Sequence, residues 1–468
     1  MPPSIATVCY LVLIAALFWL DRNRTVRTSA ALWVPVLWFW LACSRSLTQW
    51  LQMDSVASVD QVMEGSPLDR AVYMCLVIVG AIIVLWRRQQ IAQILRSNGT
   101  IVLFFSYCLV SLLWSDYPDV AFKRWIKAIG DLIMVLIVLS DRHPLEAVER
   151  LFARVAYLLI PLSVLLIKYY PELGRGYGAW LGEVQYFGVT TNKNTLGVIC
   201  LFLGLAALWR TLTLYRAKQT QHRFRKMIAQ AVILVMVLWM LKIADSMTSL
   251  SCFLMGSILI VAANLRMVRR RPLFIHLLIA TMLLASVSVV FLGASPETLK
   301  TMGRNPTLTD RTAVWKMVLG LSQNQWVGTG FESFWLGPRL EKMWTRYWWH
   351  PGEAHNGYLE IFINLGWVGI ALLFVVVAAG YQTVFQAWRN HVATGSLCLA
   401  FFMVGLAYNF TEAAFFRMLA PAWLFFLLAI VRMPAMVPRK ARVSTQNLLQ
   451  AADPGCREPI TAALNPAT

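Results

Sequence analysis

Thirteen apolar stretches, separated by short and mostly basic segments, constrain the fold of this chain more than any other feature. They lie near residues 5–20, 30–44, 71–86, 100–114, 125–140, 155–170, 194–209, 228–243, 247–265, 273–292, 359–380, 395–410 and 418–432. A transmembrane helix needs about 20 apolar residues to cross roughly 30 Å of hydrocarbon. Several stretches are shorter, so twelve spans fit the pattern as well as thirteen. The sequence therefore predicts an all-α fold, a polytopic bundle of 12–13 transmembrane helices.

The composition agrees with this prediction and excludes several classes of protein. Hydrophobic residues make up 58% of the 468 residues, charged residues only 14%, and the mean hydropathy is +0.60. Because a soluble domain carries about 25% charged residues, a water-soluble enzyme is excluded. The eight cysteines show no C-x-x-C spacing and no pairing in outer loops, which argues against a zinc site or a disulfide framework.

The net charge of +19 comes from Lys and Arg spread over short loops such as 87–96 and 266–271. This distribution is typical of loops that face the cytoplasm and anionic lipid, and it does not indicate a nucleic-acid partner. We therefore expect the long segment 293–358 on the opposite, external side. The chain then divides into N-terminal transmembrane helices at 1–98, central transmembrane helices at 99–292, a large external loop with short interfacial helices at 293–358, C-terminal transmembrane helices at 359–436 and a disordered cytoplasmic tail at 437–468.

The external segment contains two candidate site residues. Asp310 is a candidate N-cap for a helix that carries Arg311 and lies flat in the membrane interface. Arg311 either serves a site or reaches lipid phosphates. His355 stands before Asn356 and a long apolar helix, where a neutral imidazole can accept a proton from a hydroxyl or can simply cap the helix. No metal is expected, because His350, Glu353 and His355 lack the spacing of known metal motifs.

Other polar residues occur at membrane boundaries on the same side. Arg124 follows SLLWSDYPDVAFK, Arg175 lies in GRGYGAW, and GVTTNKNTLG presents Asn192, Lys193 and Asn194 at the start of a helix. A helix N-terminus with a nearby cation favours anions such as phosphate. The pattern lacks a P-loop, so it gives no support for ATP use. It predicts an outward-facing basic cavity that suits a lipid-linked phosphate.

Four segments of the chain are similar to one known family. Residues 111–124, 188–197, 310–331 and 355–369 resemble, in order and spacing, the O-antigen ligase/polymerase superfamily of bacterial membrane glycosyltransferases. The resemblance spans roughly 100–432 and is nearest to the exopolysaccharide-production branch, whose members polymerise succinoglycan-type repeats. It implies a GT-C-like helical fold, an active site at the periplasmic face of the bacterial inner membrane, an undecaprenyl-diphosphate-linked oligosaccharide as donor, and no cofactor or metal.

The resemblance also implies roles for particular residues. His355 corresponds to the family's histidine and would be the catalytic base, while Arg311 would bind the donor diphosphate. Lys193 stands where relatives place a basic residue, and Arg124 and Arg175 are further candidates for diphosphate binding. The supporting residues expected around them are Asn192, Asn194, Asn356 and Glu332.

The implied function is polymerisation of lipid-linked repeat units into exopolysaccharide. A ligase that transfers finished polysaccharide to lipid A-core or to protein is the first alternative, because it shares the donor chemistry. A glycolipid transporter or flippase is the second, although the sequence lacks the internal symmetry common in transporters. Expected partners are the lipid-linked oligosaccharide, membrane lipid, a flippase and a chain-length co-polymerase.

Overall fold

The computed structural model describes residues 1–22, 26–53, 65–178, 182–217, 222–291, 307–322 and 324–433. Six described helices are long and apolar enough to cross a membrane, and a bent pair, Arg88–Ser97 with Gly99–Trp114, makes a seventh if it counts as one span. Each of the thirteen apolar stretches coincides with a helix of the structure. The polytopic, all-helical class is thus confirmed, while the count of 12–13 spans stays a prediction. The expected tail at 437–468 lies outside the described residues.

The first part of the chain contains both short and long helices. They are α1 Pro3–Leu20, η1 Ala30–Leu32, α2 Trp33–Ala42, α3 Leu47–Trp50, α5 Pro67–Trp86, α6 Arg88–Ser97, α7 Gly99–Val110, η2 Ser111–Trp114, α8 Pro118–Leu139, α9 Pro144–Tyr169 and α10 Pro171–Gly174. A small antiparallel hairpin follows, with β1 Arg175–Tyr177 paired to β2 Val184–Tyr186. The remaining helices are α11 Lys193–Arg216, α12 Arg223–Ala244, α13 Met247–Ala263, α14 Arg266–Arg270, α15 Leu273–Phe291, α17 Thr307–Leu321, α18 Gly337–Arg346, α19 Gly357–Asn390, α20 Val392–Tyr408 and α21 Pro421–Ile430.

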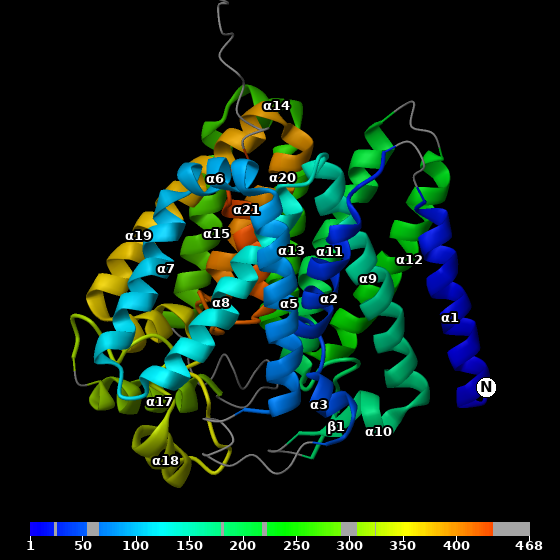
Figure 1. The fold of residues 1–468 in the computed structure, drawn as a ribbon. Helices are drawn as coiled ribbons and strands as arrows, with labels where there is room; N and C mark the ends of the chain where they lie inside the picture. Colours follow the sequence, from blue (N-terminus) through cyan, green and yellow to red (C-terminus); the bar gives the residue numbers. More distant parts are fainter. Residues whose placement is uncertain are drawn as a thin grey trace, which may run out of the picture.

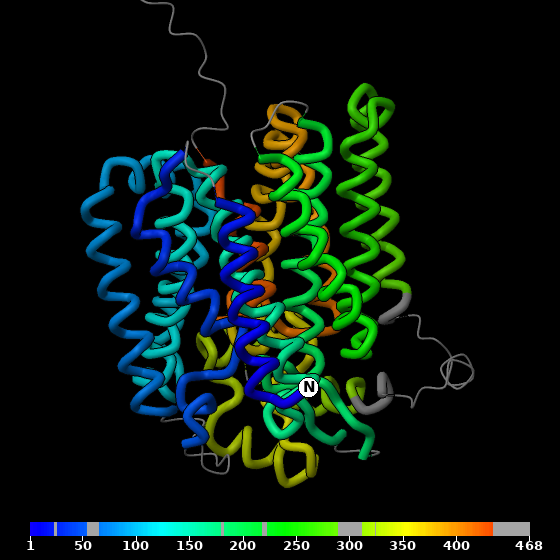
Figure 2. Tube along the Cα trace, turned by 90° about the vertical axis from the view of Figure 1, so that its right-hand side faces the viewer, coloured from blue at the N-terminus to red at the C-terminus, as the bar shows by residue number. Residues whose placement is uncertain are grey.

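The long helices run side by side and form one bundle (Figures 1 and 2). In their most apolar windows α9 and α11 are each 78% buried, whereas α1 is only 11% buried and lies on the outside of the bundle. Aromatic rings fill the centre, where the rings of Phe202 and Phe425 stack at a centroid distance of 4.9 Å. The short elements α6 and α14 lie at one end of the bundle, and α10, α17 and α18 lie at the other (Figure 1).

Helix α19 is broken at Gly366, where φ is 64° and ψ is −163°. Only glycine enters this region without strain, and a Cβ there would lie 2.2 Å from the carbonyl oxygen of Trp326. The break lets the segment before Gly328 hydrogen-bond to α19, with Trp367 N–H donating to the Gln325 carbonyl at 2.9 Å. The part of α19 after the break is by itself long enough to cross roughly 30 Å of hydrocarbon at 1.5 Å per residue. The first turns of α19 therefore belong to the α17 and α18 end.

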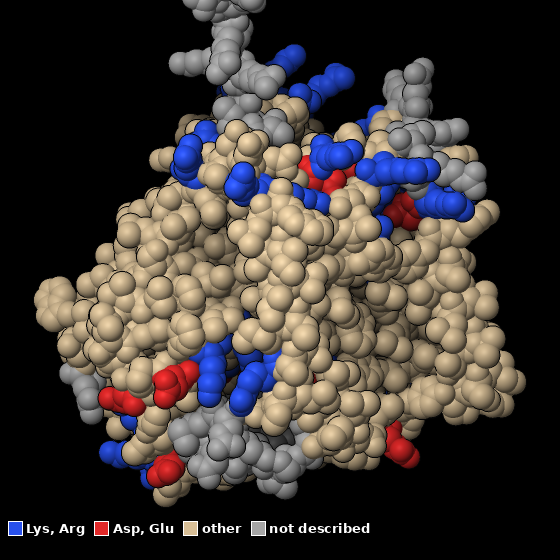
Figure 3. All heavy atoms as spheres, in the orientation of Figure 1, with Lys and Arg blue, Asp and Glu red and all other residues tan. Residues whose placement is uncertain are grey.

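The two ends of the bundle differ in charge. Figure 3 shows many basic side chains with a few acidic ones at the α6 and α14 end, and a more even mixture of the two at the α17 and α18 end. The basic end includes a pocket lined by Arg27, Arg87, Arg88 and Arg142. Such asymmetry is what the positive-inside rule describes for membrane proteins.

Candidate functional site

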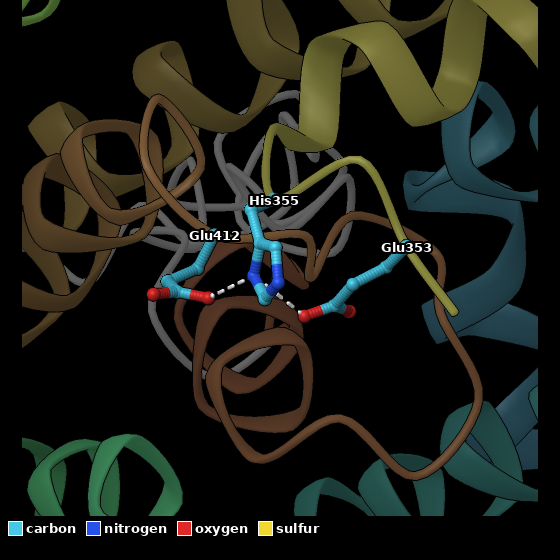
Figure 4. Close-up of side chains that lie close together, drawn as sticks. All are labelled: Glu353, His355 and Glu412. Atoms are coloured by element: carbon cyan, nitrogen blue, oxygen red, sulfur yellow. Dashed lines mark hydrogen bonds and ion pairs between the residues drawn. The ribbon is translucent and has the colours of Figure 1, made fainter. Parts of the chain in front are cut away.

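His355 lies in the turn that leads into α19, between two carboxylates (Figure 4). Its Nδ1 atom is 2.9 Å from Oε2 of Glu412 and 3.0 Å from Oε1 of Glu353. The two glutamates stand on opposite sides of the imidazole ring. With a proton on Nδ1 the ring can donate to these carboxylates, and Nε2 is then the ring nitrogen that can accept a proton.

Glu412 comes from the turn between α20 and α21, 57 residues after His355 in the sequence. This turn is tied to the start of α19, because Gly357 N–H donates to the carbonyls of Asn409 at 2.8 Å and of Glu412 at 3.0 Å. A Cβ at Gly357 would lie 1.9 Å from Oδ1 of Asn409, so the close approach needs glycine. Asn409 in turn accepts hydrogen bonds from the N–H groups of Ala414 and Phe415. The backbone thus fixes Glu412 beside His355.

Arg311 reaches the same cluster from α17. Its guanidinium lies 3.4 Å from Oε1 of Glu412 and donates to the Thr411 carbonyl at 2.6 Å. The apolar face of α17 packs on the protein, because Val314 and Val318 are buried in a small separate core. Asp310 lies inside the helix, which begins at Thr307, so the predicted N-cap at this residue is wrong.

The small core under α17 belongs to the external segment. Its other buried members are Phe334, Trp335, Leu340, Met343, Ala354 and Ile363. Trp315 of α17 donates to the carbonyl of Ala354 at 2.7 Å, next to His355. Folding of the external segment thus places α17, and with it Arg311, against the residues that precede α19.

The N-terminus of α11 approaches Glu412 from another direction. Asn194 donates to Oε1 of Glu412 at 3.4 Å, and Nζ of Lys193 is 3.7 Å from Asp245. Asn192 caps the helix, since its side chain accepts from Thr195 N–H at 2.8 Å. The structure therefore assigns Asn192 a helix-capping contact and brings Asn194 into the site.

Arg417 and Arg124 lie on the Glu353 side of His355. Arg417 forms an ion pair with Oε2 of Glu353. Arg124 donates to the Glu332 carbonyl at 2.5 Å and lies 4.0 Å from the Glu332 carboxylate. Arg124, Glu332 and Arg417 line a cavity of about 150 Å³. Its wall also includes Trp335, Trp344, Gly352 and Glu360.

Two other predicted residues have contacts of a different kind. Asn356 caps α19, accepting from the N–H groups of Tyr358 and Leu359 at 3.0 and 3.1 Å. Arg175 stays on the hairpin, where its Nε donates to the Ile167 carbonyl at 2.7 Å and its guanidinium lies over the Tyr186 ring. Arg45 holds the loop before α11, because its Nε donates to the Thr190 carbonyl at 3.2 Å, and burial lowers the pKa of Arg45. Arg175 thus makes none of the described contacts with His355 or its glutamates.

Backbone strain concentrates around this cluster. Eight described non-glycine residues have positive φ, and five of them come from the segments just discussed: Glu332, His350, His355, Phe416 and Leu419. Such conformations cost about 1–3 kcal/mol each and persist only where the surroundings enforce them. The concentration is an observed sign of a functional site.

Glu353, His355 and Glu412 also form a group whose ligand atoms all lie within 4.8 Å of one another. One nitrogen and two carboxylates resemble the donor set of a metal centre. Both carboxylates already face a guanidinium, Glu412 that of Arg311 and Glu353 that of Arg417. These ion pairs compensate the charge that a metal would otherwise neutralise.

Sequence reasoning missed Glu412 and Arg417 altogether. Both stand in YNFTEAAFFR, between two apolar stretches, where nothing local distinguishes them from ordinary boundary residues. The only signal was their place, because the turn after α20 had to emerge on the same side as the start of α19. Glu353 had been considered only as a metal ligand.

The arrangement can carry out proton transfer beside a bound anion. Nε2 of His355 can accept a proton, and the two carboxylates stabilise the imidazolium that results. Arg311 and Lys193 lie at the Glu412 side, where they can compensate negative charge on a leaving group. Fold and site together define a helical membrane protein with a histidine between two carboxylates, and cations nearby, at one end of its bundle.

Comparison with known proteins finds similarity over part of the chain. The O-antigen ligase family matches residues 231–374, a range that contains Arg311, Glu353 and His355. This match, with the relatives below, confirms the resemblance found in the sequence.

The relatives are distant. The exopolysaccharide production protein ExoQ of Rhizobium meliloti is 22% identical over 302 residues, which cover 59% of this chain and 63% of that protein. The putative polysaccharide ligase RP358 of Rickettsia prowazekii is 22% identical over 365 residues, covering 74% and 83% respectively. A putative polysaccharide ligase of Rickettsia bellii is 22% identical over 352 residues, covering 72% and 81%. The chain therefore spans slightly less than two thirds of the first of these relatives and more of the others.

Proposed function

We propose that this chain is a membrane glycosyltransferase of the O-antigen ligase type, which joins undecaprenyl-diphosphate-linked repeat units into exopolysaccharide. The observation that carries the proposal is His355, held by Glu353 and Glu412 with Arg311 on the second carboxylate. The names of the relatives, an exopolysaccharide production protein and polysaccharide ligases, support the same substrate class.

The chemistry follows from the contacts. The acceptor hydroxyl oxygen forms a bond to the anomeric carbon of the donor sugar, while the bond from that carbon to the diphosphate oxygen breaks. The hydroxyl proton passes to Nε2 of His355, and the lipid diphosphate leaves toward Arg311 and Lys193. Removal of one preorganised charge-stabilising group typically costs about 10²–10³ in kcat. A single displacement of this kind inverts the anomeric configuration, and retention in the product bond would contradict it.

The distribution of basic residues indicates which side of the membrane His355 would face. His355 lies at the end opposite the basic α6 and α14 end. The positive-inside rule puts the basic end in the cytoplasm, which would leave His355 facing the periplasm of a bacterial inner membrane. A flippase that delivers the substrate and a co-polymerase that controls chain length would then be natural partners.

The test uses purified protein in detergent with a lipid-diphosphate oligosaccharide as the only substrate, EDTA present and nucleotide absent. We expect lipid-linked glycans of increasing length by mass analysis. Product that appears only after lipid A-core or a protein acceptor is added would instead identify a ligase. The absence of any transfer, together with glycolipid movement in proteoliposomes, would support the transporter alternative. Activity that EDTA removes and a divalent metal restores would overturn metal independence.

A further inference from the structure

A cavity lies beside the ion pair of Arg417 with Glu353, and neither Glu353 nor His355 is among its lining residues. We will call it the Arg417 pocket, defined by Arg124, Glu332, Trp335, Trp344, Gly352 and Arg417. Its residues come from α8, from the external segment and from the turn after α20. One ion pair, Arg417 with Glu353, separates the pocket from His355.

The two sides of His355 have different surroundings. On the Glu412 side stand Arg311 and Asn194, bonded to the same carboxylate oxygen. On the Glu353 side stand Arg417 and the cavity. A transfer reaction needs a donor and an acceptor, and the two sides differ enough in their surroundings for each to receive one of them.

The lining of the Arg417 pocket suits an uncharged, hydroxylated ligand. Its two guanidiniums are each paired with a carboxylate, Arg124 with Glu332 and Arg417 with Glu353, so neither cation is left over for a diphosphate. Carboxylate and guanidinium groups bond adjacent hydroxyls in pairs. Trp335 and Trp344 offer aromatic surface, which packs against the C–H face of a ring.

Size and access agree with this chemistry. The cavity measures about 150 Å³, so it suits a small ligand such as one ring better than a long chain. The side chains of Glu332 and Arg417 are 21% and 36% exposed, so the pocket is open to the outside.

From this geometry we propose that the Arg417 pocket binds the terminal sugar of the acceptor glycan and holds it on the Glu353 side of His355. The assignment rests on the proposed transferase function and specifies it. Arg124 then serves the acceptor sugar, which differs from the donor-diphosphate role expected for it from the sequence.

The test compares a pocket-filling variant with a matched control. A Cβ at Gly352 meets nothing within 4 Å, so Gly352→Trp can fill the pocket without a backbone clash. Gly99→Trp is the control, because Gly99 is exposed, has the same open surroundings and starts α7 at the α6 end. Glu332→Gln is a milder second variant that keeps the side-chain volume.

The first measurement is turnover with a lipid-linked donor and a lipid-free acceptor, the oligosaccharide released from the same lipid by mild acid. We expect Gly352→Trp to raise the acceptor KM at least 30-fold and Glu332→Gln about 10-fold, with the donor KM within twofold of wild type. A raised donor KM, or an unchanged acceptor KM in both variants, would overturn the proposal.

The second measurement is saturation-transfer NMR of the lipid-free oligosaccharide alone, which requires no turnover. We expect transfer to the terminal sugar with wild type and Gly99→Trp and its loss with Gly352→Trp. Equal signals for wild type and Gly352→Trp would exclude the pocket even if the enzyme is active. A chain that binds the sugar here yet transfers nothing would retain this binding site and lose the proposed function.

Discussion

The two ends of the helical bundle carry the same kind of cation but use it differently. At the basic end, exposed arginines such as Arg88, Arg142 and Arg269 line the rim, and the ion pairs described there all involve one residue, Arg210. At the other end, Arg311 and Arg417 are each fixed by a carboxylate that also contacts His355. The comparison teaches that positive charge by itself indicates topology, whereas a cation bonded to a carboxylate beside a base indicates a site.

Arg311→Ala should give the largest loss among the cation variants. It removes the guanidinium that lies on Glu412, so we expect kcat to fall about 10²–10³-fold. The control is Lys316→Ala, which removes an exposed positive charge from the same helix. Steady-state transfer of a lipid-linked glycan checks both, and equal losses in the two variants would mean that Arg311 only reaches lipid phosphates.

Glu412→Gln should follow, with a decrease of about 10²-fold. The amide keeps the shape but removes the negative charge that stabilises protonated His355, and it weakens the hold on Arg311. Glu341→Gln, on the exposed face of α18, is the matched control. Full activity of Glu412→Gln would show that Glu353 alone is enough to stabilise protonated His355.

Lys193→Met should have a smaller effect, about tenfold in the donor KM. Its partner Asp245 has a 71% exposed side chain and lies 3.7 Å away, so the pair is screened by solvent. Measurement of the donor and acceptor KM separately checks this prediction. A change in the acceptor KM alone would mean that Lys193 contacts the acceptor and not the donor.

Arg269→Gln, at the basic end, should leave transfer within twofold of wild type. Arg269 lines a rim of arginines far along the bundle from α17, so it can affect insertion but not the reaction. The rate per correctly inserted protein is the quantity to compare. A large decrease in that rate would mean that arginines at the basic end also take part in the reaction.

Much of the fold was predictable from the sequence because hydropathy acts locally. Each apolar stretch became a helix, and the alternation of basic loops anticipated the charged rim. The break in α19 was not predicted, since it depends on Gly366 meeting the carbonyl of Trp326, a residue 40 positions earlier.

The candidate site could be predicted only in part, for residues whose type and local sequence suggest a role by themselves. His355 and Arg311 were expected to act together, and the structure brings both to Glu412. Glu412 and Arg417 were missed, because their role depends on a turn folding back onto the start of α19. Arg124 was expected with the diphosphate but lies with Glu332 in the Arg417 pocket. Which of these side chains lie beside His355 depends on how distant helices pack together, and no local sequence pattern predicts that packing.

The most direct test of the account is single-turnover transfer by His355→Ala with saturating donor and acceptor. The control is His391→Ala, an exposed histidine at the junction of α19 and α20, at the other end of the bundle. General-base catalysis contributes about 10²–10⁴-fold, so we expect the His355→Ala rate to fall by that factor while donor affinity and His391→Ala remain at the wild-type level. A His355→Ala protein that transfers at the wild-type rate would contradict the central claim.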